Sequence, residues 1–170
     1  MLCSLMIVAG SWLARPAAVQ AAPSVPEEAT TVREGYKTQY PVPGGPLNLA
    51  VEAPGRIWFT APDADGIGAI IVTSDPNEQT VRYRVDFIGL GRDSEPYDLV
   101  YAGDAIWFTL RGAGQIGRIN PATREVALFP LSTPDSGPTG IDVGPDGQVW
   151  VAEATGRLSK LDPTSGSVTE

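Results

Sequence analysis

The sequence has no histidine and only one cysteine, Cys3, among its 170 residues. Without an imidazole, the chain can hold neither a Ser-His-Asp triad nor a histidine base. Cys3 lies in the apolar N-terminal run, so the rest of the chain has no thiol for a disulfide, a thiolate metal site or a cysteine nucleophile. These two absences exclude most nucleophilic and thiolate chemistry from the chain.

Positive charge is also scarce, because 12 Lys and Arg stand against 20 Asp and Glu, a net charge of −8. Binding to nucleic acid depends on clustered Lys and Arg that neutralise phosphates, so this balance excludes nucleic acid as the main partner. Apolar residues make up 42% of the chain, which is a globular composition. The 19 Gly and 16 Pro are spread along the chain and read as turn residues between short strands.

The N-terminal segment differs from the rest of the chain. An apolar run over residues 2–13 is too short to cross a bilayer, and Val19 and Ala21 follow it in the small-residue pattern that a signal peptidase reads. We expect residues 1–21 to be a signal peptide, although its usual positive charge is missing; the alternative is a buried apolar strand or helix. Residues 22–35 are expected to be a flexible spacer. The mature chain would then be secreted or periplasmic and have no membrane span.

Three features recur in the same order along the rest of the chain. A proline opens a short strand, a tryptophan strand follows it after 12, 11 and 12 residues, and an Asx-Pro turn comes next. Such steady offsets indicate an internal repeat of about 42–50 residues. The opening prolines, the tryptophans and the turns are Pro46, Pro96 and Pro138; Trp58, Trp107 and Trp150; Asp75-Pro76, Asn120-Pro121 and Asp162-Pro163.

Each repeat divides into four short strand candidates separated by turn residues, such as the Gly-Pro-Asp-Gly of residues 144–147. Four short strands in about 45 residues is the sequence form of one β-propeller blade. We therefore predict an all-β protein of three blades, each of four antiparallel strands, at about residues 43–87, 88–131 and 132–170. The alternative is a stack of hairpins in an open solenoid.

A lone strand is predicted ahead of the first blade. Residues 36–42 resemble the outer strand at 125–131, since both have an aromatic residue followed by Pro and an aliphatic residue. In a closed propeller, such an offset strand completes the last blade of the ring. Propellers have about 4–8 blades, whereas residues 36–170 hold about three. We therefore expect either a truncated chain or self-association through the open blade edges.

The repeats resemble those of the virginiamycin B lyase (streptogramin lyase) family. The resemblance is carried by residues 129–150, by the Ile-Trp-Phe-Thr strand at 106–109 and by residues 115–121, and it covers residues 36–170. It implies a seven-bladed propeller, of which this chain would hold about three blades. The lyase of that family opens a cyclic depsipeptide antibiotic by elimination, with a histidine and a divalent metal that is usually magnesium.

The resemblance also indicates which positions face the central channel. The family often has a histidine directly after the proline that opens the inner strand, and the matching residues here are Leu47, Tyr97 and Thr139. An elimination needs a base and an acid, and we assign no catalytic residue in this chain. Tyr97, Asp98 and Asp142 lie on the inner strands and are candidates for ligand contacts in the channel.

A candidate metal ligand comes from the same comparison. The family often ends its tryptophan strand with glutamate, and the matching residues are Ala61, Leu110 and Glu153. Glu153 is a candidate for binding magnesium, because carboxylates suit that ion, although one carboxylate makes a weak site. The alternative is a solvated loop carboxylate. No cofactor is expected unless the lyase activity is present, in which case magnesium is.

Two functions stay open on the sequence. The first is an exported, non-catalytic propeller module that binds a small molecule or a protein. The second is a fragment of a streptogramin-lyase-like enzyme, a carbon–oxygen lyase whose catalytic residues lie in other blades. The three repeated tryptophans are expected to pack between blades in either case.

Overall fold

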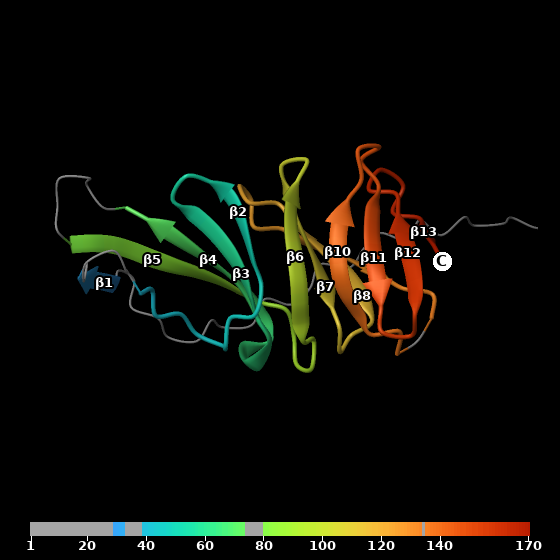
Figure 1. Ribbon diagram of the computed structural model, residues 1–170, viewed down its shortest axis with the longest axis horizontal. Helices are drawn as coiled ribbons and strands as arrows, with labels where there is room; N and C mark the ends of the chain where they lie inside the picture. Colours follow the sequence, from blue (N-terminus) through green and yellow to red (C-terminus); the bar gives the residue numbers. More distant parts are fainter. Residues whose placement is uncertain (1–28, 33–38, 74–79, 134) are drawn as a thin grey trace, which may run out of the picture.

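The computed structural model describes residues 29–32, 39–73, 80–133 and 135–170 (Figure 1). The expected signal peptide at 1–21 lies outside these residues. Within the described ranges, no helix has the length and hydropathy needed to span a bilayer. The regular secondary structure of these residues is β-strand, apart from one short 3-10 helix, η1 (Pro62–Ala64).

Three antiparallel sheets follow one another along the chain and stand side by side (Figure 1). In each sheet four strands pair in sequence order, as in a propeller blade. The first blade contains β2 (Leu49–Ala53), β3 (Arg56–Ala61), β4 (Gly66–Val72) and β5 (Thr80–Gly89). The second contains β6 (Pro96–Ala102), β7 (Ala105–Leu110), β8 (Gln115–Ile119) and β9 (Val126–Pro130). The third contains β10 (Pro138–Val143), β11 (Val149–Glu153), β12 (Arg157–Leu161) and β13 (Val168–Thr169). The predicted fold class, all-β with four-stranded antiparallel blades, is confirmed.

The extra strand lies earlier in the chain than predicted. β1 (Ala29–Val32) pairs antiparallel with β5 and adds a fifth strand to the outer edge of the first blade. It therefore falls inside the segment 22–35 that was expected to be a spacer, and not in residues 36–42. In this structure the offset strand extends the first blade.

The described part of the predicted lone strand, residues 39–42, is not a strand. Tyr40 packs edge-on against Tyr83 of β5, with ring centroids 5.1 Å apart. The Tyr83 hydroxyl donates a hydrogen bond to the Pro41 carbonyl at 3.1 Å. Because proline has no backbone N–H, Pro41 cannot donate to a strand ladder, and the segment is held by these side-chain contacts instead.

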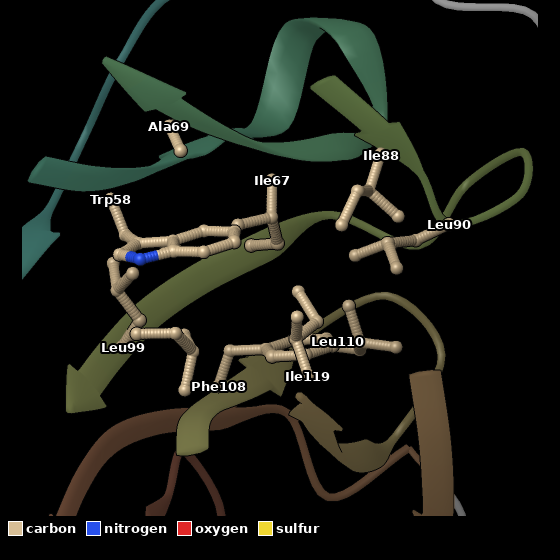
Figure 2. Packing of buried hydrophobic residues seen from close by; sticks show 10 residues of the cluster. Trp58, Ile67, Ala69, Ile88, Leu90, Leu99, Phe108, Leu110 and Ile119 are labelled. Atoms are coloured by element: carbon tan, nitrogen blue, oxygen red, sulfur yellow. The ribbon is translucent and has the colours of Figure 1, made fainter. Parts of the chain in front are cut away.

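Apolar side chains fill the spaces between neighbouring blades. Because side chains alternate along a strand, each tryptophan strand sends its Trp toward the next blade and its aromatic or aliphatic neighbour toward the preceding one. Trp58 is 3% exposed and packs against Leu99 and Phe108 of the second blade (Figure 2). Trp107 is 4% exposed and lies in a second cluster with Val151 of the third blade. The prediction that these two tryptophans pack between blades is confirmed.

Close packing inside the blades requires glycine on the third strand. A Cβ at Gly117 would lie 2.0 Å from the ring of Phe108 on the neighbouring strand, and Gly68 in the first blade has the same relation to Phe59 at 2.1 Å. In the third blade a smaller Val replaces the Phe, and the glycine position becomes Ser159. The third blade therefore has room for a polar side chain where the other two are filled by a ring.

Candidate functional site

The inner strands β6 and β10 begin at the prolines that open their repeats, whereas β2 begins at Leu49, shortly after Pro46. In β6 the ladder with β7 shifts register between Pro96 and Leu99, so the two residues between them stand off the regular pairing. β10 has a similar irregularity just after Pro138. Irregularities of this kind re-aim side chains at the ends of strands. The candidates Tyr97 and Asp98 lie in this irregular stretch.

A threonine hydroxyl joins the first two blades behind these candidates. Thr60 of β3 accepts a hydrogen bond from the Asn48 N–H at 3.0 Å and donates one to the Tyr97 carbonyl at 3.2 Å. The Asn48 side-chain amide also donates to the Tyr97 carbonyl, at 2.8 Å. The backbone of Tyr97 is therefore fixed by the preceding blade, while its side chain is left for other contacts.

The same link recurs between the second and third blades. Thr109 of β7 accepts a hydrogen bond from the Asp98 N–H at 3.0 Å and donates one to the Thr139 carbonyl at 3.0 Å. Thr109 is fully buried, with 0% of its surface exposed. The tryptophan-strand threonines thus connect the inner strands of successive blades in two places.

The Asp98 carboxylate takes part in this blade-to-blade connection. One oxygen accepts a hydrogen bond from the Leu99 N–H at 2.9 Å, and the other accepts from the Ile141 N–H of the third blade at 3.2 Å. The structure therefore places Asp98 at the boundary between two blades, with both oxygens already bonded.

The Tyr97 side chain lies in a different environment from the Asp98 carboxylate. Its ring is half-buried, and the Arg111 guanidinium carbon lies 5.6 Å from the ring centroid, within the range of a cation–π interaction. Arg111 is exposed in the turn that follows β7. Arg111 was not predicted as a site residue, because its only signal in the sequence is its position directly after the end of a tryptophan strand. Together the two side chains present a cation over an aromatic ring beside the start of β6.

Asp142 is exposed and lies apart from the other two candidates. Its Oδ1 accepts a hydrogen bond from the N–H of the next residue, Val143, at 2.8 Å. In register it pairs with Trp150, which is 41% exposed and has the Lys160 ammonium 5.5 Å from its ring centroid. The matching inner-strand residue of the second blade is Val100, two positions beyond Asp98. The three candidates therefore do not form one cluster.

Glu153 is buried, with 5% of its surface exposed, so the alternative of a solvated loop carboxylate is wrong. The Ser159 hydroxyl donates a hydrogen bond to its Oε1, and no described residue donates to its buried Oε2. Magnesium needs six oxygen ligands in octahedral geometry. The described ranges contain no group of three or more Asp, Glu, Cys or His that could hold a metal ion. The described residues around Glu153 do not make up a magnesium site by themselves, and its role as a ligand stays a prediction.

Comparisons with known proteins agree on one family. The virginiamycin B lyase family matches residues 29–170. A virginiamycin B lyase of Nocardia farcinica (strain IFM 10152) is 32% identical over 116 residues, which make up 68% of this chain and 38% of that protein. This chain therefore spans well under half the length of that relative.

Two solved structures extend the comparison. Virginiamycin B lyase from Staphylococcus aureus aligns with a TM-score of 0.63 and 27% identity, over 74% of this chain and 40% of that one. A catalytically inactive variant of the Staphylococcus aureus enzyme, solved with quinupristin, aligns with a TM-score of 0.64 over 84% of this chain and 45% of that one. At 24% identity, the second likeness shows the shared fold alone.

Proposed function

Because this chain belongs to the virginiamycin B lyase family, we propose that it is an exported β-propeller module that binds a ligand or a protein partner without catalysing an elimination itself. The observation that carries the proposal is the state of the Asp98 carboxylate. Both of its oxygens accept backbone N–H groups, one of them from the neighbouring blade. The carboxylate thus serves to join two blades, and the sequence has no histidine for the base that an elimination needs.

The ligand surface in this proposal is the pair of Tyr97 and Arg111. A half-buried aromatic ring beneath a guanidinium offers an apolar face, a hydroxyl and a positive charge in one place. Such a pair suits a ligand with aromatic rings and peptide carbonyls. A cyclic depsipeptide has both, and a relative of the same fold was solved with quinupristin. We therefore propose a cyclic depsipeptide or a similar peptide as the ligand class.

Calorimetric titration of the full chain with quinupristin tests this surface. Tyr97→Ala and Arg111→Ala should each weaken binding by about two- to fivefold, since each removes one half of a solvent-exposed cation–π pair. Asp104→Asn is the matched control, because Asp104 lies in the turn at the far end of β6 and should leave the affinity unchanged. Equal affinities for all four proteins, or no heat of binding to the parent chain, would overturn the proposed surface.

Export rests on the N-terminal sequence. If residues 1–21 are removed by a signal peptidase after Ala21, the mature protein begins at Ala22. N-terminal sequencing of the protein collected from the periplasm or the medium should therefore read Ala-Pro-Ser. A product that stays in the cytoplasm and begins at Met1 would contradict export.

The second candidate function is lyase activity carried by a longer propeller to which these blades contribute. The 32% identity to a virginiamycin B lyase favours it. Sequencing the locus past the last codon tells the two apart. Downstream blades with a His after the opening Pro and a Glu after the Trp strand would support the enzyme. Four further blades without these residues would contradict it.

A second copy of the chain is the proposed protein partner. Trp150 and Leu158 on the third blade are 41% and 64% exposed, whereas their counterparts Trp107 and Ile116 are buried against the next blade. At the other end, Leu49 of the first blade is 67% exposed, although its counterpart in β6 is buried. Joining the two ends of different copies would bury both faces. Light scattering should show mass rising with concentration, and Trp150→Arg should abolish the rise; a strict monomer rules this partner out.

A further inference from the structure

A hollow of about 370 Å³ lies between the second and third blades, at the turns that end β6 and β10. This volume falls within the range of small-molecule sites, about 300–1,000 Å³. Small residues form part of its wall, and the side chains of Trp107 and Arg118 form another part. Arg118 is the one charged residue in the lining. The hollow lies at the opposite end of β6 from Tyr97, so it is distinct from the surface proposed above.

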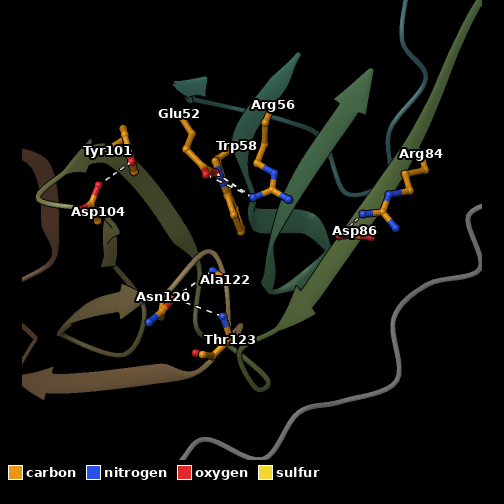
Figure 3. A network of polar contacts seen from close by, with 10 residues as sticks. All are labelled: Glu52, Arg56, Trp58, Arg84, Asp86, Tyr101, Asp104, Asn120, Ala122 and Thr123. Carbon is orange, nitrogen blue, oxygen red and sulfur yellow. Dashed lines mark hydrogen bonds and ion pairs between the residues drawn. The ribbon is translucent and has the colours of Figure 1, made fainter. Parts of the chain in front are cut away.

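The first blade has a carboxylate beside its tryptophan at the same end of the blade. There the indole N–H of Trp58 donates a hydrogen bond to Glu52 Oε2 at 2.7 Å (Figure 3). The guanidinium of Arg56 donates to Glu52 Oε1 at 3.2 Å. A tryptophan N–H and an arginine therefore share one carboxylate beside the space between two blades.

The second blade has a tryptophan and an arginine beside the hollow but no carboxylate. The ladder of β2 with β3 shifts register next to Glu52, so Glu52 is an extra residue in a bulge. The ladder of β6 with β7 is regular at the matching place, so β6 has no residue that corresponds to Glu52. Arg118 lies on β8 whereas Arg56 lies on β3, so the two arginines reach their tryptophans from different strands. At the end of β6 the methyl group of Ala102 lines the hollow.

Neither Arg118 Nε nor the Trp107 indole N–H has a hydrogen-bond acceptor among the residues that the structure describes. The Arg118 guanidinium carbon lies 5.6 Å from the Trp107 ring centroid, and its Nε is buried with no hydrogen-bond partner there. Within the same ranges, neither an ion pair to Arg118 nor an acceptor for the Trp107 indole N–H is found. A buried donor without a partner is costly, more so when it is charged.

We propose that this hollow binds a small organic carboxylate, which supplies the acceptor that Trp107 and Arg118 lack. The ligand would accept hydrogen bonds from the Trp107 indole N–H and from Arg118, a pairing of guanidinium and carboxylate that is strong and directional. Its apolar part would lie against Val143 and Pro163, which also line the hollow. The site binds a ligand of this class whether or not the Tyr97 surface binds a depsipeptide.

Sodium benzoate is the probe, followed by the indole N–H signals of the ¹⁵N-labelled full chain. Trp107→Phe identifies the Trp107 signal by its loss. Benzoate should shift that signal saturably and leave the Trp58 signal in place, because the Trp58 N–H already has Glu52 as its acceptor. Benzamide, which is neutral and of the same shape, should bind at least tenfold more weakly. Equal binding of benzoate and benzamide, or no shift of the Trp107 signal, would overturn the proposal.

Two variants and a control sharpen the test. Ala102→Glu places a carboxylate in the wall of the hollow and should weaken benzoate binding at least tenfold, since the chain then supplies its own acceptor. Arg118→Gln should weaken it by about tenfold or more, because a charge-assisted hydrogen bond is lost. Arg111→Gln, an arginine beside a ring outside the hollow, should bind as the parent does. Unchanged binding in Ala102→Glu contradicts the proposal, and the comparison with benzamide decides the matter in the parent chain if a variant does not fold.

Discussion

Replacing Thr109 with valine tests how the blades are held together. Valine keeps the shape of the side chain and removes the hydroxyl that accepts from the Asp98 N–H and donates to the Thr139 carbonyl, both at 3.0 Å. Thr109 is fully buried, so water cannot take over these bonds. A net hydrogen bond is worth about 0.5–1.5 kcal/mol, and a buried group left unpaired costs about 1–3 kcal/mol. For two such groups we expect a loss of about 2 kcal/mol, or about 30-fold in the folding equilibrium.

Urea unfolding followed by circular dichroism measures this loss. The midpoint should fall while the dependence on urea concentration stays the same, because the variant folds to the same structure. Thr155→Val is the matched control, since Thr155 is exposed in the turn between β11 and β12. A loss of less than about 0.5 kcal/mol for Thr109→Val, or a loss equal to that of the control, would refute the reasoning, because surface substitutions usually change stability by no more than that.

Three further predictions concern packing, a buried carboxylate and pH. Gly117→Ala should cost roughly 1–3 kcal/mol in urea unfolding, whereas Gly140→Ala, with 3.6 Å to its nearest neighbour, should be close to neutral. Replacing Glu153 with Leu together with its partner Ser159 with Ala should raise the free energy of unfolding by about 1 kcal/mol, because the pair includes a buried oxygen without a partner. A lower stability would contradict this, and a magnesium-dependent rise in Tm of the parent alone would mark Glu153 as a metal ligand. Hydrogen bonds from Thr133 lower the pKa of Glu170 from its ordinary value of 4.5, so its contribution is present above that pH and is lost as the pH falls through the folded-state pKa. Glu170→Gln should therefore flatten the fall in Tm below about pH 4.5, and identical Tm curves would contradict this.

The repeat allowed the blades to be predicted from the sequence because its signals are local. The opening Pro, the Trp strand and the turn residues each act within a few positions, and the observed strands fall where these signals place them. The lone strand was misplaced because its pairing with β5 joins segments about 50 residues apart, which no local pattern reports.

The candidate site was harder to predict because its contacts cross from one blade to the next. Asp98 looks like a free carboxylate in the sequence, and only the position of Ile141 in the next blade shows that it is bonded. Glu153 looks like the start of a loop, but strand alternation turns its side chain into the blade interface. The hollow beside Arg118 could not be predicted, because its walls come from turns of two blades that only the fold brings together.

The central claim is that these three blades bind without opening a ring ester. The most direct test is to incubate the full chain with a cyclic depsipeptide and magnesium, and to separate the cyclic and linear forms by chromatography. We predict no linear product above the level in buffer alone, because an elimination needs a base and the chain has no histidine. Linear product that forms in proportion to the protein concentration would contradict the claim.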